Sequence, residues 1–444
     1  MIQQERIKNL NGREIKQGSY VLYWMQASHR TEYNHALEHA ILQANKLNKP
    51  LLVFFGLINN YPEANERHYY FMLEGLKKVQ SSLEKRDIKM VIWDKSPEVG
   101  VVEISKHASL VVVDRGYLKI QKKWSRQVAK RIECPLLKVE SDSIVPVEVT
   151  SPKEEYSAAT FRPKIEKKLD NYLIPLKKNR PKIGSFDLDF YSFDIKDIKK
   201  AILHLNIDRS VKRINEFHGG TSDAKKHLEA FLKNKLDRYP ELRNDPTVDY
   251  LSNMSPYLHF GQISPLYIAL KVLATDSPGK DVYLDELIVR RELSINFVFY
   301  NPNYDSFDGL PEWVRKTLLE HKKDPREYTY TLEEFETAET HDPYWNAAQK
   351  EMIFWGKMHG YMRMYWGKKI LEWNKNPEYA FKTALYLNNK YELDGRDPNS
   401  FTGVAWCLGK HDRPWKERPI FGKIRYMNER GLKRKFDIDR YVEK

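Results

Sequence analysis

The sequence predicts an α/β domain with a parallel sheet and, after a long linker, a mostly helical domain. Three observations support this prediction. The first 140 residues alternate between short apolar runs and helical stretches, a proline-interrupted segment follows, and strand signals are missing beyond about residue 206. At 444 residues the chain is also too long for one ordinary hydrophobic core. We therefore expect domains at 1–142 and 206–444, joined by a linker at 143–205.

The α/β domain is expected to alternate regularly from its first strand. Short runs rich in Val, Leu and Ile predict strands at 19–25, 50–57, 88–94, 108–114 and 135–141, with helices at 32–49, about 66–86, about 97–107 and about 118–133. Apolar strands separated by helices favour a parallel sheet covered on both faces. No GxGxxG follows the first strand, so the usual dinucleotide fingerprint is absent. By analogy with similar folds, a ligand of this domain is expected at the carboxyl ends of its strands.

The linker and the helical domain differ in periodicity. Five prolines interrupt residues 143–205, where only 162–172 shows a helical pattern. Beyond 206, helical periodicity is found at 221–238, 264–274, 283–298, 347–373 and 376–390.

Composition and charge favour a globular protein that binds a polyanion. Hydrophobic residues make up 41% of the chain, and Lys and Arg outnumber Asp and Glu by 74 to 61, a net charge of +13. The two cysteines, Cys134 and Cys407, suggest neither a disulfide framework nor a metal site. The polar start argues against a signal peptide, and the strongest apolar run, 51–58, is too short to span a bilayer. We expect a soluble, cytoplasmic protein.

The stretch KMHGYMRMYWGKKILEW at 357–373 is unusually aromatic for a Lys-rich protein. On a helix, its spacing brings Trp366 and Trp373 to nearly the same face, and Trp345 and Trp355 lie upstream. Two interpretations stand: an aromatic core helix, or a file of indoles along which an electron hops to a strong photo-oxidant. Trp355 is expected in the core under either interpretation.

Two polar stretches suggest a ligand pocket in the helical domain. In LSNMSPYLHFGQISP (251–265), polar side chains precede a helix start with Pro256 at a first helical position. They are suited either to simple N-capping or to holding an anion such as a pyrophosphate. The segment 385–427 is dense in Gly, Asn, Asp and Arg, with tryptophans among its basic residues. It favours pocket-lining loops and either a nucleic-acid surface or a solvated basic face.

Several long motifs resemble those of class II cyclobutane pyrimidine dimer photolyases. They are LSNMSPYLHFGQIS, DELIVRRELSINF, THDPYWNA, KMHGYMRMYWGKKILEW, YELDGRDPN and GVAWCLGKHDR with GKIRYM, and the similarity extends over nearly the whole chain. The resemblance implies a Rossmann-like antenna domain and a helical FAD-binding domain. It implies a deoxyribodipyrimidine photo-lyase in which light-excited FADH⁻ donates an electron to a flipped-out dimer, the cyclobutane ring opens, and the electron returns to the flavin.

For the cofactor, the resemblance implies three groups of residues. The first would bind FAD, mainly its phosphates: Tyr239, Leu251, Ser252, Asn253, Met254, Ser255 and Asp397. The second lies at the flavin ring, with Arg363 and Asp394 as an ion pair that stabilises the anionic reduced flavin and Asn388 near flavin N5. The third is the electron-transfer route of Trp345, Trp366, Trp373 and Tyr330. The first domain would hold either an antenna chromophore of the 8-hydroxydeazaflavin or methenyltetrahydrofolate type, or none.

For the substrate, the resemblance implies that Glu286 lies next to the dimer and acts as a protonated donor or through a bridging group. Arg290 is four residues away, so both side chains are expected at one pocket, although some relatives carry an aromatic residue there. Met364 and Trp406 would form apolar walls, Arg413 and Arg425 would enter the space left by the lesion, and Arg243 and Asn244 would touch DNA nearby.

The expected partner is UV-damaged DNA, bound by a monomer with no obligatory protein partner. Two alternatives remain. A signalling photoreceptor of the same superfamily would bind flavin without repairing DNA, but such relatives often carry a long C-terminal extension and this chain stops at Lys444. A flavin-free nucleic-acid-binding protein would keep only the scaffold, and it would be colourless when purified.

Overall fold

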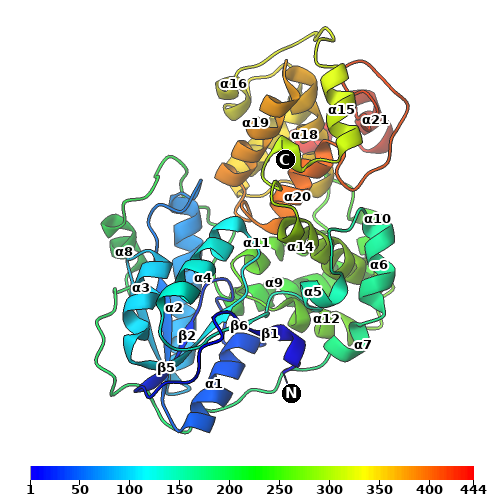
Figure 1. Cartoon of the computed structure of the whole chain (residues 1–444). Helices are drawn as coiled ribbons and strands as arrows, with labels where there is room; N and C mark the ends of the chain where they lie inside the picture. The colour runs from blue at the N-terminus through cyan, green and yellow to red at the C-terminus, as the bar shows by residue number, and fades with distance from the viewer. Residues whose placement is uncertain (1) are drawn as a thin grey trace. The chain divides into compact units, whose positions relative to one another are not determined.

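The computed structural model describes residues 2–444, which form two compact units (Figure 1). The sheet unit comprises the residues up to Pro152, Lys164–Ala230 and Asn253–Thr275, and the helical unit comprises Lys153–Pro163, Phe231–Ser252 and Asp276–Lys444. This division differs from the expected one. Residues 206–230 and 253–275, assigned above to the helical domain, belong to the sheet unit, and the expected linker is divided between both units.

The sheet unit is built on six strands in the order β1-β6-β5-β2-β3-β4. They are β1 (Ile7–Asn9), β2 (Tyr20–Trp24), β3 (Leu51–Gly56), β4 (Lys89–Trp93), β5 (Ala108–Asp114) and β6 (Leu136–Val139). The five expected strands are confirmed and pair in parallel. The sequence did not predict β1, which pairs antiparallel with β6 at the sheet edge, because a three-residue strand with two exposed side chains carries no periodic pattern.

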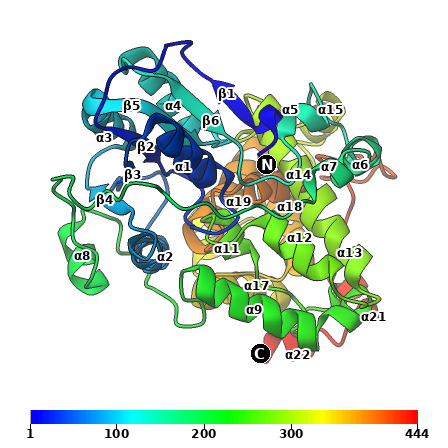
Figure 2. The ribbon, with the colours of Figure 1, turned by 90° about the horizontal axis from the view of Figure 1, so that it is seen from below.

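Helices cover both faces of this sheet (Figure 2). The helices α1 (His35–Leu47) and α2 (Glu66–Glu84) pack on one face, while α3 (Pro97–Ile104) and α4 (Lys119–Arg131) pack on the other. Alternate residues of a strand point to opposite faces, so Tyr23 joins the first core and Trp24 the second. The remaining helices lying wholly in this unit are α5 (Val147–Thr150), α7 (Leu169–Tyr172), α8 (Ile198–His204), α11 (Ser255–His259) and α12 (Pro265–Leu273).

Part of the expected linker covers an edge of the sheet. The carbonyl of Ile92 in the edge strand β4 accepts the N–H of Phe193 at 2.7 Å, and Trp93 Nε1 donates to the carbonyl of Tyr191 at 2.9 Å. Phe190 and Phe193 pack against the two cores of the unit. Pairing of this kind protects a strand edge from associating with other chains.

In the described part of the helical unit the regular elements are all helices. They are α10 (Tyr239–Leu242), α13 (Lys280–Leu284), the π-helical turn η4 (Asp285–Arg290), α14 (Arg291–Tyr300), α15 (Glu312–Glu320), α16 (Leu332–Glu336), α17 (Pro343–Trp355), α18 (Gly360–Trp373), α19 (Pro377–Tyr391), α20 (Pro398–Cys407), α21 (Glu429–Lys435) and α22 (Asp439–Val442). Two further helices, α6 (Ala158–Glu166) and α9 (Thr221–Asn234), contain residues of both units. Within residues 2–444, no helix combines the length and the apolar content needed to span a bilayer.

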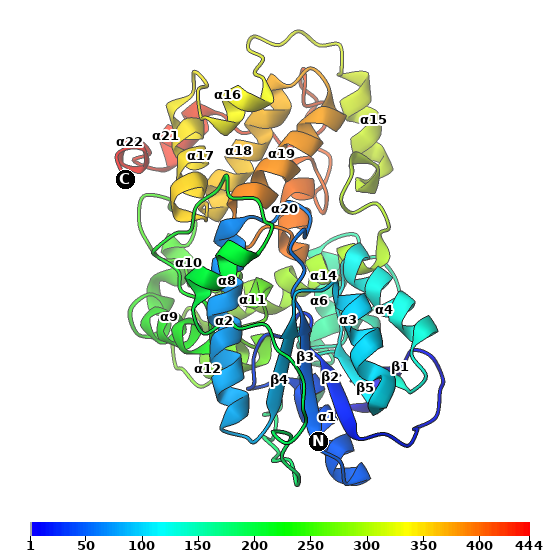
Figure 3. The same ribbon diagram turned by 90° about the vertical axis from the view of Figure 1, so that its left-hand side faces the viewer.

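Three helices around the candidate site begin with the same device, an Asx residue followed by proline. The side chains of Asp342, Asn376 and Asp397 accept backbone N–H groups at the starts of α17, α19 and α20, and each is followed by a proline at the first helical position. The expected helix at 347–373 is divided because α17 ends at Gly356, which adopts φ +68°. The helices α17, α18 and α19 lie side by side (Figure 3).

Candidate functional site

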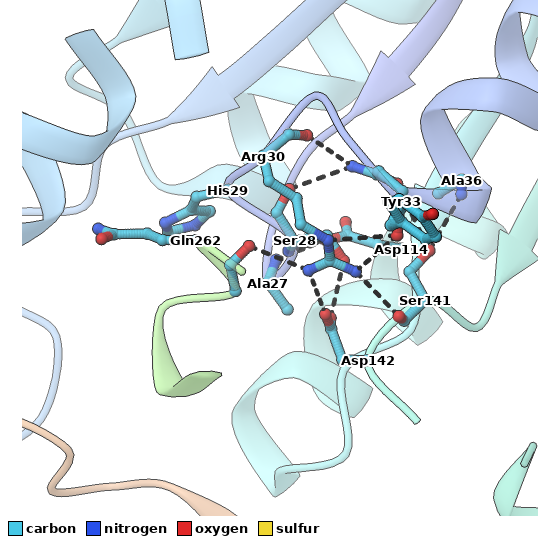
Figure 4. Close-up of polar contacts among 12 residues, drawn as sticks. Ala27, Ser28, His29, Arg30, Tyr33, Ala36, Asp114, Ser141, Asp142 and Gln262 are labelled. Carbon is cyan, nitrogen blue, oxygen red and sulfur yellow. Dashed lines mark hydrogen bonds and ion pairs between the residues drawn. The ribbon is translucent and has the colours of Figure 1, made fainter. Parts of the chain in front are cut away.

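The carboxyl edge of the sheet holds a buried polar cluster, the Arg30 cluster, formed by Ser28, Arg30, Asp114, Ser141 and Asp142 (Figure 4). It lies where β2 and β5 end, the position at which such sheets usually bind ligands. The buried Arg30 guanidinium donates to Asp142 Oδ1 at 2.6 Å and to the carbonyls of Ser141 at 2.9 Å and Gly261 at 3.0 Å. Its Nε donates to the carbonyl of Tyr33 at 3.3 Å. The chain itself therefore satisfies every nitrogen of this guanidinium.

Asp114 fixes the loop that follows β2. Its carboxylate accepts the N–H groups of Gln26 at 2.7 Å and of Ala27 at 2.6 Å, as well as that of Ser28. Burial, reinforced by the charge of Asp142, raises the pKa of Asp114 to about 6 in spite of these hydrogen bonds. The charges of the Arg30 cluster thus hold the loop in place instead of facing a ligand.

The helical unit contains a half-buried arginine in a different environment. It belongs to the Arg363 cluster, formed by Arg363 and the buried Asn388, Glu392 and Asp394. Arg363 on α18 donates to Glu392 Oε1 at 2.9 Å, and the same oxygen accepts the N–H of Met358 at 3.1 Å. The charge of Asp394 also acts on the Glu392 carboxyl group. The resemblance named Asp394 as the ion-pair partner of Arg363, whereas the guanidinium pairs with Glu392, a residue that sequence reasoning missed. The signal was available, since Glu392 is a second carboxylate in YELDGRDPN.

Protons and charges in the Arg363 cluster are tightly coupled. Burial lowers the pKa of Arg363, but the charges of Glu392 and Asp394 outweigh this effect and raise that pKa above its usual value. Burial raises the pKa of Glu392 to about 8, although Arg363 acts to lower it. Glu392 therefore keeps its proton to a higher pH than an ordinary glutamate does.

Arg363 Nε and Asn388 Oδ1 are buried polar atoms that have no hydrogen-bond partner within residues 2–444. Asn388 on α19 is 1% exposed, and its Nδ2 donates to Asn389 Oδ1 at 3.3 Å. A buried polar atom left unpaired costs about 1–3 kcal/mol, so such atoms mark a place where an additional group fits. The flavin ring that the resemblance implies has hydrogen-bond donors and acceptors suited to both atoms.

Three buried tryptophans and a tyrosine form a continuous aromatic file, in the spatial order Trp366, Trp345, Trp373 and Tyr330. Trp345 from α17 stacks on Trp366 from α18, with ring centroids 6.3 Å apart and planes 8° from parallel. Trp345 lies 5.9 Å from Trp373, which lies 5.4 Å from Tyr330. Each tryptophan is 3% exposed or less. The three rings therefore belong to the core, and each also lies next to the following ring of the file. The two interpretations of the sequence are therefore compatible.

Trp355 lies outside the aromatic file. It was expected in the core, but 48% of its surface is exposed, so this expectation is wrong. Trp355 is the last residue of α17, and Gly356 ends the helix directly after it. The helical spacing could not reveal this, because it does not show where the helix stops.

The predicted lesion residues gather around the π-helical turn η4. The carboxylate of Glu286 in η4 is ion-paired with Arg243, whose guanidinium carbon lies 6.0 Å from the centre of the Tyr239 ring. Arg290, at the other end of η4, pairs with Asp285 at 3.4 Å. Tyr239, expected at the FAD phosphates, therefore lies beside Arg243 and Glu286, which are expected at the lesion. Sequence reasoning assigned an ordinary helical spacing to Glu286 and Arg290 and did not foresee the π-helical turn, a feature common at functional sites.

The predicted DNA contacts are brought together by an aromatic ring. The guanidinium carbons of Arg413 and Arg425 lie 5.5 and 5.4 Å from the centre of the Trp415 ring. Both arginines are exposed, as are Asn244 and, at 39%, Trp406. Met364 is half-buried, with its sulfur 3.8 Å from Cys407 Sγ. An exposed set of arginines around a tryptophan has the chemistry of a nucleic-acid surface.

The residues predicted at the FAD phosphates are distributed over both units. Tyr239, Leu251 and Ser252 belong to the helical unit, whereas Asn253, Met254 and Ser255 belong to the sheet unit. Pro256 lies in the first turn of α11 as expected, but the N-cap residue is Met254 and no side chain caps this helix. Simple N-capping therefore does not explain the polar stretch. Asp397 accepts the N–H of Asn399 at 2.8 Å and caps α20.

Comparisons with known proteins point to one protein family. Residues 21–182 match the family model described as DNA photolyase. The chain is 55% identical to the deoxyribodipyrimidine photo-lyase of Methanothermobacter thermautotrophicus over 448 residues, covering 100% of this chain and 98% of the relative. It is 41% identical to the protein of the same name from Arabidopsis thaliana, covering 97% of this chain and 91% of that relative.

Solved structures share the fold at low sequence identity. The class III photolyase of Agrobacterium tumefaciens superposes with a TM-score of 0.72 at 17% identity, over 97% of this chain and 87% of that one. The archaeal photolyase of Sulfolobus tokodaii, solved with two FAD molecules, superposes with a TM-score of 0.72 at 16% identity, over 95% of this chain and 89% of that one.

Proposed function

The chain belongs to the DNA photolyase family, and we propose that it splits cyclobutane pyrimidine dimers in DNA by light-driven electron transfer, as a photolyase of the class II type. It is an enzyme of light-dependent DNA repair, as the full-length relatives named deoxyribodipyrimidine photo-lyase indicate. The single observation that supports the proposed mechanism best is the Arg363 cluster, with two unpaired buried polar atoms in the same unit as the aromatic file.

The residues of the Arg363 cluster fit FAD. Bound and reduced, FAD supplies the light-excited electron that opens the cyclobutane ring. Arg363 supplies a fixed positive charge that favours the anionic reduced flavin, and its ion pair with Glu392 orients the guanidinium. Asn388 offers an amide that adapts to either protonation state of the ring. The phosphates would be held by Tyr239, by the run Leu251–Ser255 and by Asp397.

On the lesion side, the proposal assigns the chemistry to Glu286 and Arg243 together. Glu286 uses a carboxylate oxygen to accept from Arg243, whose guanidinium has further N–H groups that can donate to a bound base. Arg243 is then the bridging group through which Glu286 acts on the dimer. Arg290 is held by Asp285, and Met364 and Trp406 provide apolar surface for the extruded bases. Extrusion costs a few kcal/mol, and least for a damaged pair that stacks poorly.

DNA binding would rest mainly on phosphate contacts. The net charge of +13 and the exposed Arg413 and Arg425 favour a polyanion, and Trp415 between them provides a surface on which a base can stack. Affinity should therefore fall steeply with salt. We propose that the protein acts as a monomer, a state that light scattering at working concentration would test.

An antenna chromophore of the deazaflavin or folate type would bind at the carboxyl edge of the sheet. The Arg30 cluster is closed, so its charges do not contribute to such a site. The polar atoms left there are the buried side-chain amide of Gln26 and His29 Nδ1, which lack hydrogen-bond partners in the described chain. An absorption band of the purified protein that flavin does not explain would support a bound chromophore.

Light-dependent repair tests the proposed function. Prereduced protein is illuminated with blue light beside an oligonucleotide that contains one thymine dimer, and the restored ultraviolet absorbance of thymine is followed against a dark control. Repair in the light alone is expected. A signalling photoreceptor would bind flavin and leave the dimers intact, and a flavin-free binding protein would release no flavin on denaturation.

The lesion assignment has its own test. Glu286→Ala should lower the repair yield per absorbed photon more than it lowers DNA affinity, because the carboxylate acts on the splitting step. Glu241→Ala is the matched control, since this exposed carboxylate pairs with Arg238 near Arg243. Equal losses of yield and affinity in Glu286→Ala would contradict the assignment.

A further inference from the structure

The outer end of the aromatic file is occupied by a tyrosine and a histidine in direct contact. The Tyr330 hydroxyl is hydrogen-bonded to His341 Nδ1, and the backbone N–H of His341 donates to the Tyr330 oxygen at 3.0 Å. Because that oxygen accepts from a backbone N–H, its own proton is free to be donated to the imidazole nitrogen. In the tautomer that carries its ring proton on Nε2, His341 Nδ1 accepts the proton of the Tyr330 hydroxyl.

The same two side chains join the file to the surface. Tyr330 lies 5.4 Å from Trp373 and is half-buried, whereas His341 is exposed. The His341 ring also lies 5.1 Å from the Trp373 ring and stacks on Tyr328 at 3.7 Å, with planes 19° apart. An electron therefore has a path inward from Tyr330, and a proton has a path outward through His341.

A tyrosine can replenish a tryptophan only if its proton leaves with the electron. Burial raises the pKa of the Tyr330 hydroxyl, with the nearby carboxylates of Glu334 and Asp342 acting in the same direction. Loss of the proton to water by itself is therefore slow. A base within hydrogen-bond distance removes this obstacle, as in general base catalysis.

We propose that Tyr330 and His341 form a proton-coupled terminus for photoreduction of the flavin, in which His341 is the proton acceptor. With light-excited oxidised flavin bound as the electron acceptor, Trp366 would give up one electron, and Trp345 and then Trp373 would replace it in turn. Tyr330 then gives one electron to the oxidised Trp373 and one proton to His341 Nδ1. Neutral Trp373, a neutral tyrosyl radical and an imidazolium result, and the exposed imidazolium returns its proton to solvent. This inference rests on the proposed function, because it assumes flavin bound at the inner end of the file.

The experiment is flash photolysis of the holoenzyme with oxidised flavin, following the tryptophan and tyrosyl radicals separately. His341→Gln keeps a hydrogen-bond acceptor but cannot hold the proton, and His341→Phe keeps only the stack on Tyr328. His321→Gln is the matched control, since this histidine lies between Asp324 and Glu417, outside the aromatic file. We expect tyrosyl formation to slow about 100-fold in both His341 variants, the lower end of a general base contribution. The rate of tryptophan oxidation should be unchanged in both His341 variants. In the unsubstituted protein and in His321→Gln, the tyrosyl radical should form more slowly in D₂O than in H₂O, because proton transfer to His341 accompanies electron transfer. The His341 variants should lack this isotope effect.

Two outcomes separate the inference from the function on which it rests. Tyrosyl formation at an unchanged rate in His341→Gln, or without a solvent isotope effect in the unsubstituted protein, would overturn the role of His341. Repair by prereduced enzyme does not use this terminus, so it should be equal in the His341 variants and the unsubstituted protein. Absence of repair in the unsubstituted protein would instead overturn the proposed function.

Discussion

Each of the two units pairs an arginine with a buried carboxylate, but the hydrogen bonds of the two arginines differ. In the sheet unit, Arg30 has acceptors from the chain on all its nitrogens. In the helical unit, Arg363 has a carboxylate on one side, while its Nε and the neighbouring Asn388 Oδ1 have no partner among residues 2–444. A closed polar cluster stabilises a loop, whereas an incomplete one requires another molecule. Arg30 and Arg363 thus differ in how far the chain satisfies their hydrogen bonds, and the unpaired atoms beside Arg363 are available to a bound molecule.

The largest expected effect comes from replacing one buried tryptophan in each unit. Trp24 in the sheet core and Trp366 in the aromatic file are both almost fully buried. Trp366→Phe should slow photoreduction of oxidised flavin at least about 100-fold, equivalent to about 2.7 kcal/mol of activation free energy, because the file loses its first donor. Trp24→Phe should cost about 1–3 kcal/mol of stability and leave photoreduction unchanged.

Steady illumination with an external reductant measures the rate of flavin photoreduction in Trp366→Phe and in Trp24→Phe. Prereduced Trp366→Phe should still repair dimers, because repair does not pass an electron through the file. A collapse of repair in that sample would contradict the role assigned to Trp366.

Removal of Arg30 should mainly lower the free energy of unfolding. Arg30→Met leaves Asp142 buried without its guanidinium, and loss of one partner of a buried ion pair costs about 3–5 kcal/mol. Urea denaturation followed by circular dichroism measures this loss in the free energy of unfolding. A change below about 1 kcal/mol would show that the Arg30 cluster does not hold the loop.

The Arg363 cluster should make the free energy of unfolding depend on pH. Glu392 has a pKa raised to about 8 from a usual 4.5, so between these values the unfolded state loses a proton that the folded state keeps. The free energy of unfolding should therefore fall as pH rises, by up to about 1.4 kcal/mol per pH unit.

Glu392→Gln removes this proton exchange and should flatten the profile of the flavin-free protein between about pH 5 and 8. Glu351→Gln, a carboxylate of the same unit that accepts from His359 and Tyr441, is the matched control. Parallel profiles for Glu392→Gln and the unsubstituted protein would refute the raised pKa.

The smallest expected effect concerns the surface. Replacement of Arg413 and Arg425 by glutamine should weaken binding of dimer-containing DNA. It should also lower the slope of log affinity against log salt by about 0.9 for every phosphate that is no longer neutralised. The exposed Lys123 and Lys130 of α4 in the sheet unit provide the control pair, with no change expected from their replacement by glutamine. Equal slopes for both pairs would place the DNA elsewhere on the protein.

Most of the sheet unit could be predicted from the sequence because its strands are short apolar runs between amphipathic helices. The strand β1 was missed since three residues carry no period, and the packing of 185–193 was missed because it depends on hydrogen bonds to Ile92 and Trp93. Residues of the candidate site came from family resemblance. Their pairing did not, since a motif does not reveal that Arg363 contacts Glu392 or that Glu286 contacts Arg243. The spatial order of the aromatic file was also hidden, because Trp345 comes from a different helix than its two neighbours.

The central claim is that the incomplete cluster of the helical unit binds the flavin, and affinity for FAD tests it most directly. Apoprotein is titrated with FAD for Arg363→Met and for Arg326→Met, the latter an arginine of the same unit that donates to backbone carbonyls. The loss of a charged hydrogen bond, about 1.5–3 kcal/mol, predicts roughly tenfold to 100-fold weaker binding for Arg363→Met alone. Equal affinity of Arg363→Met and Arg326→Met for FAD would contradict the account.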